Sequence, residues 1–331
     1  VRHPSSQARH HGKNLMSETV RYRRLDAECA RLVLRGQDRV RFLSGMATCD
    51  VKGLAPGSGA YGALLTVKGK VVSDFIVSNR GGIDLLLIVS AKAAAKVCES
   101  LDRYIIVDDA VISDESSALA HLGVYGLSAL ALLTDQADAS LEPYHHRESQ
   151  GVLILATREL GPASFQVIGP AEAVSAIEHK LTQAGARPMS VDEAEVLRVE
   201  AGRPRFAIDF DEERLPQEAA LDDALCFTKG CFLGQEVVVR LRDRGQLNRR
   251  LVGLRLRGER LPSPHSKLSH PSRPVAGELT SVVHSPRLGH IALGYVHRSL
   301  WEPGTELTVT DADGNPLACS AVVTALPFAA A

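Results

Sequence analysis

The sequence FTKGCFLGQEVVVRLRDRG at residues 227–245 combines residue types that neither a simple surface loop nor a core strand requires. It places Lys229 and Cys231 on either side of Gly230, ahead of an apolar Val-Val-Val run. A positive charge beside a thiol favours the thiolate, so Lys229 and Cys231 are candidate catalytic residues. The alternative is that Cys231 is a small buried apolar side chain, as most free cysteines are.

The same stretch also contains residues suited to a ligand-binding loop. Gly230 and Gly234 permit positive φ or a close approach of the backbone to a ligand. Glu236 is either an acceptor for the N–H groups of a heterocycle or a surface carboxylate. Five arginines follow within a short distance: Arg240, Arg242, Arg244, Arg249 and Arg250. They predict a local basic patch for a carboxylate-bearing ligand tail or RNA phosphates, with a solvated strand face as the alternative.

Composition narrows the function classes that the chain can have. The chain has 331 residues, of which 45% are hydrophobic, so it can bury a large core in two or three domains. Its 38 Lys and Arg nearly balance 39 Asp and Glu, so no global charge draws it to nucleic acid or anionic lipid. No apolar run reaches the roughly 18 residues of a membrane span. We therefore predict no membrane association.

Cysteine and histidine spacing predicts no metal site. The six cysteines form no C-x-x-C pair, and the twelve histidines form no ligand constellation. Scattered thiols of this kind are typical of a reduced, cytoplasmic protein. G-x-G-x-x-G, P-loop and G-x-S-x-G motifs are also missing from the sequence, which disfavours nucleotide-binding and serine-hydrolase functions.

Periodicity and turn residues predict an α+β fold with antiparallel sheets. Residues 61–66, 71–78 and 84–89 form a series of strands separated by Gly-containing turns, and residues 104–112 also indicate strands. The segment SVDE at residues 190–193 is a capping box, which predicts a helix that extends to about residue 200.

We expect three parts along the chain. Residues 1–21 are predicted to be a disordered extension, because they start with a polar, basic segment without an apolar core; Met16 is a candidate true start. Residues 22–246 are predicted to form a body with two subdomains, of about residues 22–115 and 116–246.

The C-terminal part has a different pattern. Residues 247–328 contain five strand candidates and no helix signal, which predicts a small β-barrel. The Pro- and Ser-rich segment 261–274 is predicted to be a long loop within it.

Two acids outside the arginine-rich stretch are further candidates for a site. Glu200 lies at the predicted C-terminus of a helix, where a carboxylate opposes the helix dipole. Asp74 lies within a strand pattern, which disfavours Asp, although it could simply face water. Asp74 is the third candidate catalytic residue.

At residues 229–236, KGCFLGQE resembles the K-G-C-[FY]-x-G-Q-E signature of the YgfZ-type folate-binding proteins, a group that includes iron–sulfur assembly factors. Flanking and distant segments fit as well: LPQEA at 215–219, RG at 244–245, NRR at 248–250, RFL at 41–43 and KGK at 68–70. In the C-terminal part, GELTS at 277–281 and IALG at 291–294 resemble the wider glycine-cleavage T-protein superfamily. The resemblance covers residues 22–328.

This resemblance implies a T-protein-like body that binds tetrahydrofolate or a one-carbon derivative, followed by the β-barrel. It implies that Glu200 hydrogen-bonds the pterin ring and that Arg240 and Arg244 meet the glutamyl carboxylates. It also implies a loop at the folate opening, formed by Lys229, Gly230, Cys231, Phe232, Gly234, Gln235 and Glu236.

The resemblance leaves alternative functions. The first is an accessory protein for iron–sulfur cluster assembly or repair, and thereby for iron–sulfur-dependent tRNA modification, with client enzymes or assembly proteins as partners and direct tRNA contact open. The second is a tetrahydrofolate-dependent aminomethyltransferase or demethylase. Ser73 stands where aminomethyltransferases have the first of two adjacent acids, so we expect the first function. The third is a folate-free binding module whose arginines grip tRNA or a protein.

Overall fold

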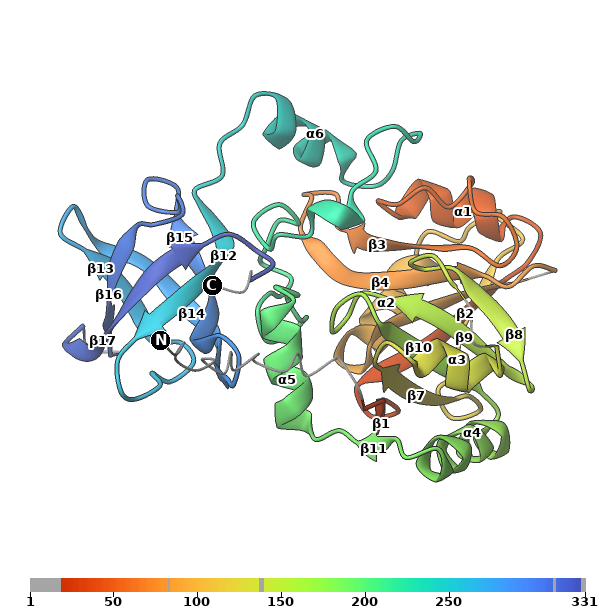
Figure 1. The fold of residues 1–331 in the computed structure, drawn as a ribbon. Helices are drawn as coiled ribbons and strands as arrows, with labels where there is room; N and C mark the ends of the chain where they lie inside the picture. Colours follow the sequence, from red (N-terminus) through yellow and green to blue (C-terminus); the bar gives the residue numbers. More distant parts are fainter. Residues whose placement is uncertain (1–18, 83, 137–139, 312–313, 329–331) are drawn as a thin grey trace, which may run out of the picture.

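The computed structural model describes residues 19–82, 84–136, 140–311 and 314–328. It shows an α+β body with antiparallel sheets and a separate C-terminal β-barrel, so the predicted fold class is confirmed (Figure 1). Val20 is buried and β1 begins at Arg21. The end of the predicted disordered segment thus belongs to the fold, and the rest of that segment lies outside the described residues.

The first sheet of the body has five antiparallel strands in the order β3-β4-β5-β2-β6. Its strands are β2 (Cys29–Arg35), β3 (Gly59–Leu65), β4 (Val71–Asn79), β5 (Asp84–Ser90) and β6 (Val111–Asp114). The helices of this part are α1 (Arg39–Met46), η1 (Ala91–Ala93) and α2 (Ala94–Asp102). The strand predicted at residues 104–112 is wrong over most of its length, because only β6 forms there and Ile106 and Val107 are exposed.

The second sheet has six strands in the order β11-β1-β7-β10-β9-β8. Its strands are β1 (Arg21–Arg24), β7 (Ala120–Tyr125), β8 (His146–Ser149), β9 (Val152–Thr157), β10 (Ser164–Gly169) and β11 (Arg187–Pro188). The helices α3 (Ala129–Thr134) and α4 (Ala171–Gln183) belong to this part. Because β1 pairs with β7 rather than with the first sheet, the first residues of the predicted first subdomain belong to the second sheet.

The two sheets pack face to face through aliphatic side chains. Val33, Leu86 and Ile88 of the first sheet form one buried cluster with Leu153 and Leu155 of the second. Burying such side chains removes apolar surface from water, at about 25 cal/mol for each Å². This cluster therefore fixes the relative position of the two sheets.

Helix α5 (Val191–Glu200) lies between the body and the barrel (Figure 1). The predicted capping box is present: Glu193 N donates to Ser190 Oγ at 3.1 Å, and Ser190 N donates to Glu193 Oε2 at 2.9 Å. The chain then passes through η2 (Asp222–Ala224) and α6 (Gln235–Asp243) before it enters the barrel. The predicted strand-face alternative for the arginines is thus wrong for residues 235–243, which form a helix.

The barrel is a closed sheet in the order β12-β15-β14-β13-β16-β17. Its strands are β12 (Arg249–Arg257), β13 (Lys267–His270), β14 (Arg273–Ser285), β15 (Gly289–His297), β16 (Glu306–Thr310) and β17 (Pro316–Thr324). The predicted long loop at residues 261–274 contains β13, which the sequence analysis missed because its four residues, KLSH, hold a single aliphatic side chain.

A buried ionic network joins α5 to the barrel. The carboxylate of Asp209 accepts hydrogen bonds from Arg198 Nη1 at 2.6 Å and from Ser281 Oγ of β14 at 2.7 Å. Thr280 Oγ1 and the backbone N–H of Arg205 also donate to it. Arg198 and Asp209 are each only 2% exposed. This network sets where the barrel lies against the body.

Candidate functional site

A cavity of about 440 Å³ lies at the junction of the two sheets and α5. Strands β4, β5 and β10 contribute to its lining, together with the segment 203–206 that follows α5. Its polar lining residues are Glu28, Cys29, Tyr61, Asp74, Ser90, Lys92, Tyr144, Arg158, Glu159, Gln166, Arg198, Arg203 and Arg205. A largely apolar hollow with a few convergent polar groups, and a volume within the roughly 300–1,000 Å³ of small-molecule sites, can bind an organic ligand.

Asp74 is the candidate catalytic residue that the structure places in this cavity. Its Oδ2 accepts a hydrogen bond of 2.8 Å from the hydroxyl of Tyr61 on the neighbouring strand β3. Burial raises the pKa of Asp74 to about 6, and the hydrogen bond from Tyr61 partly opposes this rise. A carboxyl group with this pKa exchanges a proton readily near neutral pH, as a general acid or base must.

Strand alternation explains why Asp74 and not Ser73 faces the cavity. Successive side chains of a strand point to opposite faces. Ser73 is fully buried, and its hydroxyl donates to the backbone carbonyl of Asp74 at 2.7 Å. A carboxylate at position 73 would thus point away from the cavity.

Tyr144 forms a wall between this cavity and a smaller one of about 260 Å³. Its ring stacks on Tyr61 with centroids 6.1 Å apart and planes inclined by 16°, and both rings line both cavities. Tyr144 has a φ of 65°, which is unusual for a bulky residue. The thiols of Cys49 and Cys226 belong to the lining of the smaller cavity.

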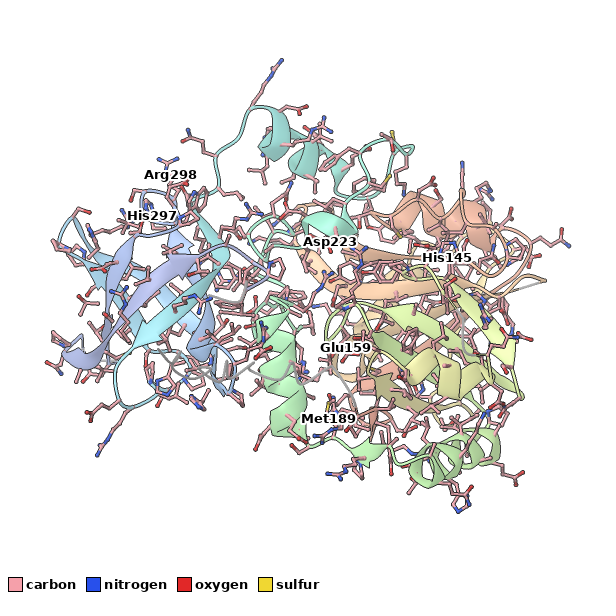
Figure 2. The ribbon with its side chains drawn as sticks, in the orientation of Figure 1. His145, Glu159, Met189, Asp223, His297 and Arg298 are labelled. Carbon is pink, nitrogen blue, oxygen red and sulfur yellow. The ribbon has the colours of Figure 1, made fainter. Side chains whose placement is uncertain are left out.

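Glu159 and Gln166 form the polar inner end of the larger cavity. Figure 2 shows Glu159 at the centre of the molecule, between α5 and the strands of the second sheet. Gln166 Nε2 donates to Glu159 Oε2 at 3.2 Å, and burial raises the pKa of Glu159. Among the described residues, the buried Oε1 of Gln166 has no hydrogen-bond partner. An unpaired buried acceptor is costly, so it favours a donor from a ligand or a water molecule.

The loop that carries the predicted reactive cysteine lies at another place. The ammonium group of Lys229 donates to the carbonyl oxygens of Ser44 and Ala47, at 2.6 and 2.5 Å, at the C-terminal end of α1. Burial lowers the pKa of Lys229. Leu233 N donates to Gly45 O at 3.0 Å in the same region. Lys229 therefore anchors the loop to α1.

Cys231 is exposed on this anchored loop. Gly234 has a φ of 80°, and a Cβ there would come within 2.5 Å of Thr66 O, so both conformation and space require glycine. The other predicted loop and tail residues are Gly230, Phe232, Gln235, Glu236, Arg240 and Arg244. None of the predicted site residues between 229 and 244 lines the larger cavity. Their predicted roles toward folate stay predictions.

Glu200 also lies outside the cavity lining. Its Oε2 accepts a hydrogen bond of 2.9 Å from Arg287, and its Oε1 accepts one from the hydroxyl of Ser285, both on the barrel. Arg198, two residues earlier on α5, lines the cavity and also donates to Ser281 of the barrel, whereas both carboxylate oxygens of Glu200 bond residues of the barrel. The role of Glu200 toward a pterin ring stays a prediction.

Most residues of the cavity lining carry no strong signal in the sequence. Tyr61 could have been found from the β3–β4 hairpin, because the register pairs Ala63 with Asp74 and so places Tyr61 on the same face as Asp74. Gln166 is a polar residue within the apolar run of β10, which is a usable signal. Glu159 and Arg203 lie in connecting segments and gave no pattern.

Two further properties concern ligands and membranes. Within residues 19–328, apart from the gaps in the description, no group of three or more His, Cys, Asp or Glu side chains is placed to hold a metal ion. None of the helices described is long and apolar enough to cross a bilayer.

Comparisons with known proteins agree with this architecture. A family model for the GCVT N-terminal domain matches residues 26–229, and a model for the glycine cleavage T-protein C-terminal barrel domain matches residues 249–329. An aminomethyltransferase of Thermosynechococcus vestitus is 31% identical over 287 residues, which are 84% of this chain and 77% of that protein. An aminomethyltransferase of Rubrobacter xylanophilus is 32% identical over 275 residues, which are 80% and 73% of the two chains.

A solved structure extends the comparison to the fold. The glycine cleavage system aminomethyltransferase T of Bartonella henselae superposes with a TM-score of 0.85, covering 95% of this chain and 87% of that chain at 22% identity. The structural likeness supports the fold. The two family models and the similar sequences show to which family the chain belongs. The chain belongs to the glycine cleavage T-protein family.

Proposed function

We propose that this protein binds tetrahydrofolate in the larger cavity and transfers an aminomethyl or related one-carbon group to it. The observation that carries the proposal is Asp74, a carboxyl group with a pKa of about 6 that lines the cavity and is held by Tyr61. Members of this family use tetrahydrofolate, which supplies the nitrogen atoms that take up a one-carbon group.

The position of Ser73 bears on the choice between functions. The expectation that Ser73 weakens the transferase function assumed that it replaces a carboxylate at the reaction site. Because Ser73 faces away from the cavity, this replacement removes no carboxylate from it. Asp74 retains the proton-transfer group that the transferase function requires, so we now prefer that function.

The lining of the cavity fits a folate. The edge of a pterin ring carries adjacent N–H donors, which the carboxylate of Glu159 can accept, and Gln166 Oε1 offers a further acceptor. Lys92 and Arg158 are exposed side chains that also line the cavity, and each can meet a carboxylate of the ligand tail. We propose these residues for the roles that the family resemblance implied for Glu200, Arg240 and Arg244.

In this proposal, the side chains of the cavity contribute the transfer of one proton. The Asp74 carboxylate accepts the proton that a folate nitrogen loses when it takes on the one-carbon group, and the Tyr61 hydroxyl orients that carboxylate. Apolar side chains on the same side as Asp74, among them Ile76 and Ile88, limit access of water to it.

Calorimetric titration with tetrahydrofolate tests the proposal. We expect wild-type protein to bind, and Glu159→Gln to bind roughly 10- to 100-fold more weakly, because a charged acceptor is lost from a buried hydrogen bond. Glu200→Gln, whose side chain faces the barrel, is the matched control and should keep wild-type affinity. Absence of binding, or weakening in Glu200→Gln alone, would contradict the placement in this cavity.

The iron–sulfur accessory role is a second candidate function, and one observation favours it. Cys231 is exposed on a loop that Lys229 fixes to α1, outside the cavity, where a partner protein can reach the thiol. A single cysteine supplies one of the four ligands that a common cluster requires, so a partner would supply the others. Client iron–sulfur enzymes, including those that modify tRNA, are the partners this function implies.

Replacement of Cys231 by serine separates the two candidate functions. If the accessory role is correct, a null strain complemented with Cys231→Ser should lose most of the activity of its iron–sulfur enzymes, while the protein stays folded and binds folate. Cys319→Ser, a change of a buried barrel thiol, is the control for loss of a cysteine elsewhere. Normal iron–sulfur enzyme activity with Cys231→Ser would exclude the accessory role in this form.

A further inference from the structure

A group of cationic side chains spans the end of α6 and the neighbouring rim of the barrel. This basic patch consists of Arg240, Arg244, Arg249, Arg273, His297 and Arg298. The five arginines are exposed. In Figure 2, His297 and Arg298 lie on the rim of the barrel next to the segment that leads from α6 into β12.

Hydrogen bonds and strand pairing hold the members of the patch together. Arg244 N donates to Arg240 O at 2.9 Å at the end of α6. Two residues further on, Gln246 accepts a hydrogen bond from the guanidinium of Arg298, and Arg298 N donates to Asn248 O at 3.0 Å. Arg249 and His297 are cross-strand partners. The patch is therefore one surface, although its residues come from three segments of the chain.

Most of the positive charge of the patch is uncompensated. Nearby, Arg242 pairs with Asp243 and Arg250 pairs with Asp222, and Arg249 reaches Glu218 at 3.4 Å. Within the described part of the chain, none of the other four arginines, Arg240, Arg244, Arg273 and Arg298, has a carboxylate within 4.0 Å of its guanidinium nitrogens. The pKa of Asp243 is lowered by the hydrogen bond from Arg242 and also, from a longer distance, by the charge of Arg244. The charges of Arg273 and Arg298, after burial, also lower the pKa of His297. The whole chain has a net charge of -1, so this concentration of cations is a local feature.

We propose that the basic patch binds the phosphate backbone of a nucleic acid. Guanidinium groups bind phosphate oxygens with two parallel hydrogen bonds, and the exposed amides of Gln246 and Asn248 add neutral contacts to the sugar–phosphate chain. Val275 is an exposed aliphatic neighbour of Arg273, and one such side chain is too little for insertion into a lipid surface. The site is separate from the folate cavity and does not depend on the proposed function.

The salt dependence of binding tests the proposal. Fluorescence anisotropy of labelled oligouridylate and of the corresponding oligothymidylate, both roughly 12 nucleotides long, is measured with the full chain over a range of salt concentrations. Four phosphate contacts predict a slope of log K against log[salt] near -3, which is roughly 50-fold weaker binding at 200 mM than at 50 mM salt. Stronger binding of the oligouridylate assigns the surface to RNA, and equal binding assigns it to either backbone.

Paired variants make the test specific. Arg244→Gln with Arg298→Gln should reduce the magnitude of the slope by about 1.4, since two contacts are lost. Arg41→Gln with Arg103→Gln removes two exposed arginines from the first part of the body and should leave the slope unchanged. No binding at low salt, an equal loss in both variants, or binding to anionic vesicles without binding to either oligonucleotide would overturn the proposal. Circular dichroism melting confirms that each variant is folded.

Discussion

Replacement of Asp74 by asparagine is expected to lower the rate of one-carbon transfer to tetrahydrofolate by roughly 10²- to 10⁴-fold. Asparagine has nearly the same shape and still accepts the hydrogen bond from Tyr61, but it cannot take up a proton. The affinity for tetrahydrofolate should change little, since Glu159 and Gln166 hold the ring in this account. The measurement is the initial rate of one-carbon loading of folate with an aminomethyl donor, followed by absorbance.

The dependence of the transfer rate on pH tests whether Asp74 acts as the proton acceptor. The carboxylate is the proton-accepting form, and it predominates above a pKa of about 6. The wild-type rate should therefore rise with pH through about 6 and then level, and Asp74→Asn should lose this limb. Ser73→Ala, at the neighbouring buried position, should keep the rate within about twofold. A wild-type rate in Asp74→Asn, or an equal loss in Ser73→Ala, would contradict the role of Asp74.

Asp74→Asn should lower the reaction rate without lowering the free energy of unfolding at neutral pH. Because burial raises the folded pKa of Asp74 above its ordinary value of 3.8, the folded state binds the proton more tightly than the unfolded state. The contribution of this group to the free energy of unfolding is thus present at low pH and is lost as pH rises from about 4 through about 6. At neutral pH, Asp74→Asn should be as stable as wild type or more stable.

Replacement of Asp209 by alanine is expected to lower the free energy of unfolding by about 3–5 kcal/mol, because it leaves the buried Arg198 guanidinium without one of its two carboxylate partners. The hydroxyls of Thr280 and Ser281 lose their acceptor at the same time. For a chain of 331 residues, the loss corresponds to a fall in melting temperature of roughly 4–7 °C. Thermal unfolding followed by circular dichroism measures it.

A matched control gives this measurement its meaning. Asp102→Ala removes an exposed carboxylate at the end of α2 and should change the free energy of unfolding by no more than about 0.5 kcal/mol. Asp209→Asn keeps one acceptor and should fall between alanine and wild type. A melting temperature of Asp209→Ala within about 2 °C of wild type would show that the network contributes little to the attachment of the barrel.

The fold was largely predictable because its elements carry local signals. The capping box of Ser190 and Glu193, for example, predicted the start of α5. The failures have local causes too. Residues 104–107 look like a strand because they are apolar, yet they pair with no strand, and β13 is too short to show alternation.

The candidate site was less predictable, because tertiary structure assembles it from distant segments. Asp74 was found because an acid within a strand is unusual. Glu159 has no pattern of its own and gains its significance only where β9 and β10 bring it beside Gln166. The motif around Cys231 was conspicuous in sequence, but the structure shows Lys229 anchoring that loop to α1 and not lining the cavity.

The most direct test of the central claim is a crystal structure of the protein with bound 5-formyl-tetrahydrofolate. We expect the ligand between the two sheets, with its one-carbon-bearing nitrogen beside Asp74 and its ring edge at Glu159 and Gln166. If the ligand binds beside Glu200 or along the loop of residues 229–236, and not in the cavity, the proposed binding site is wrong.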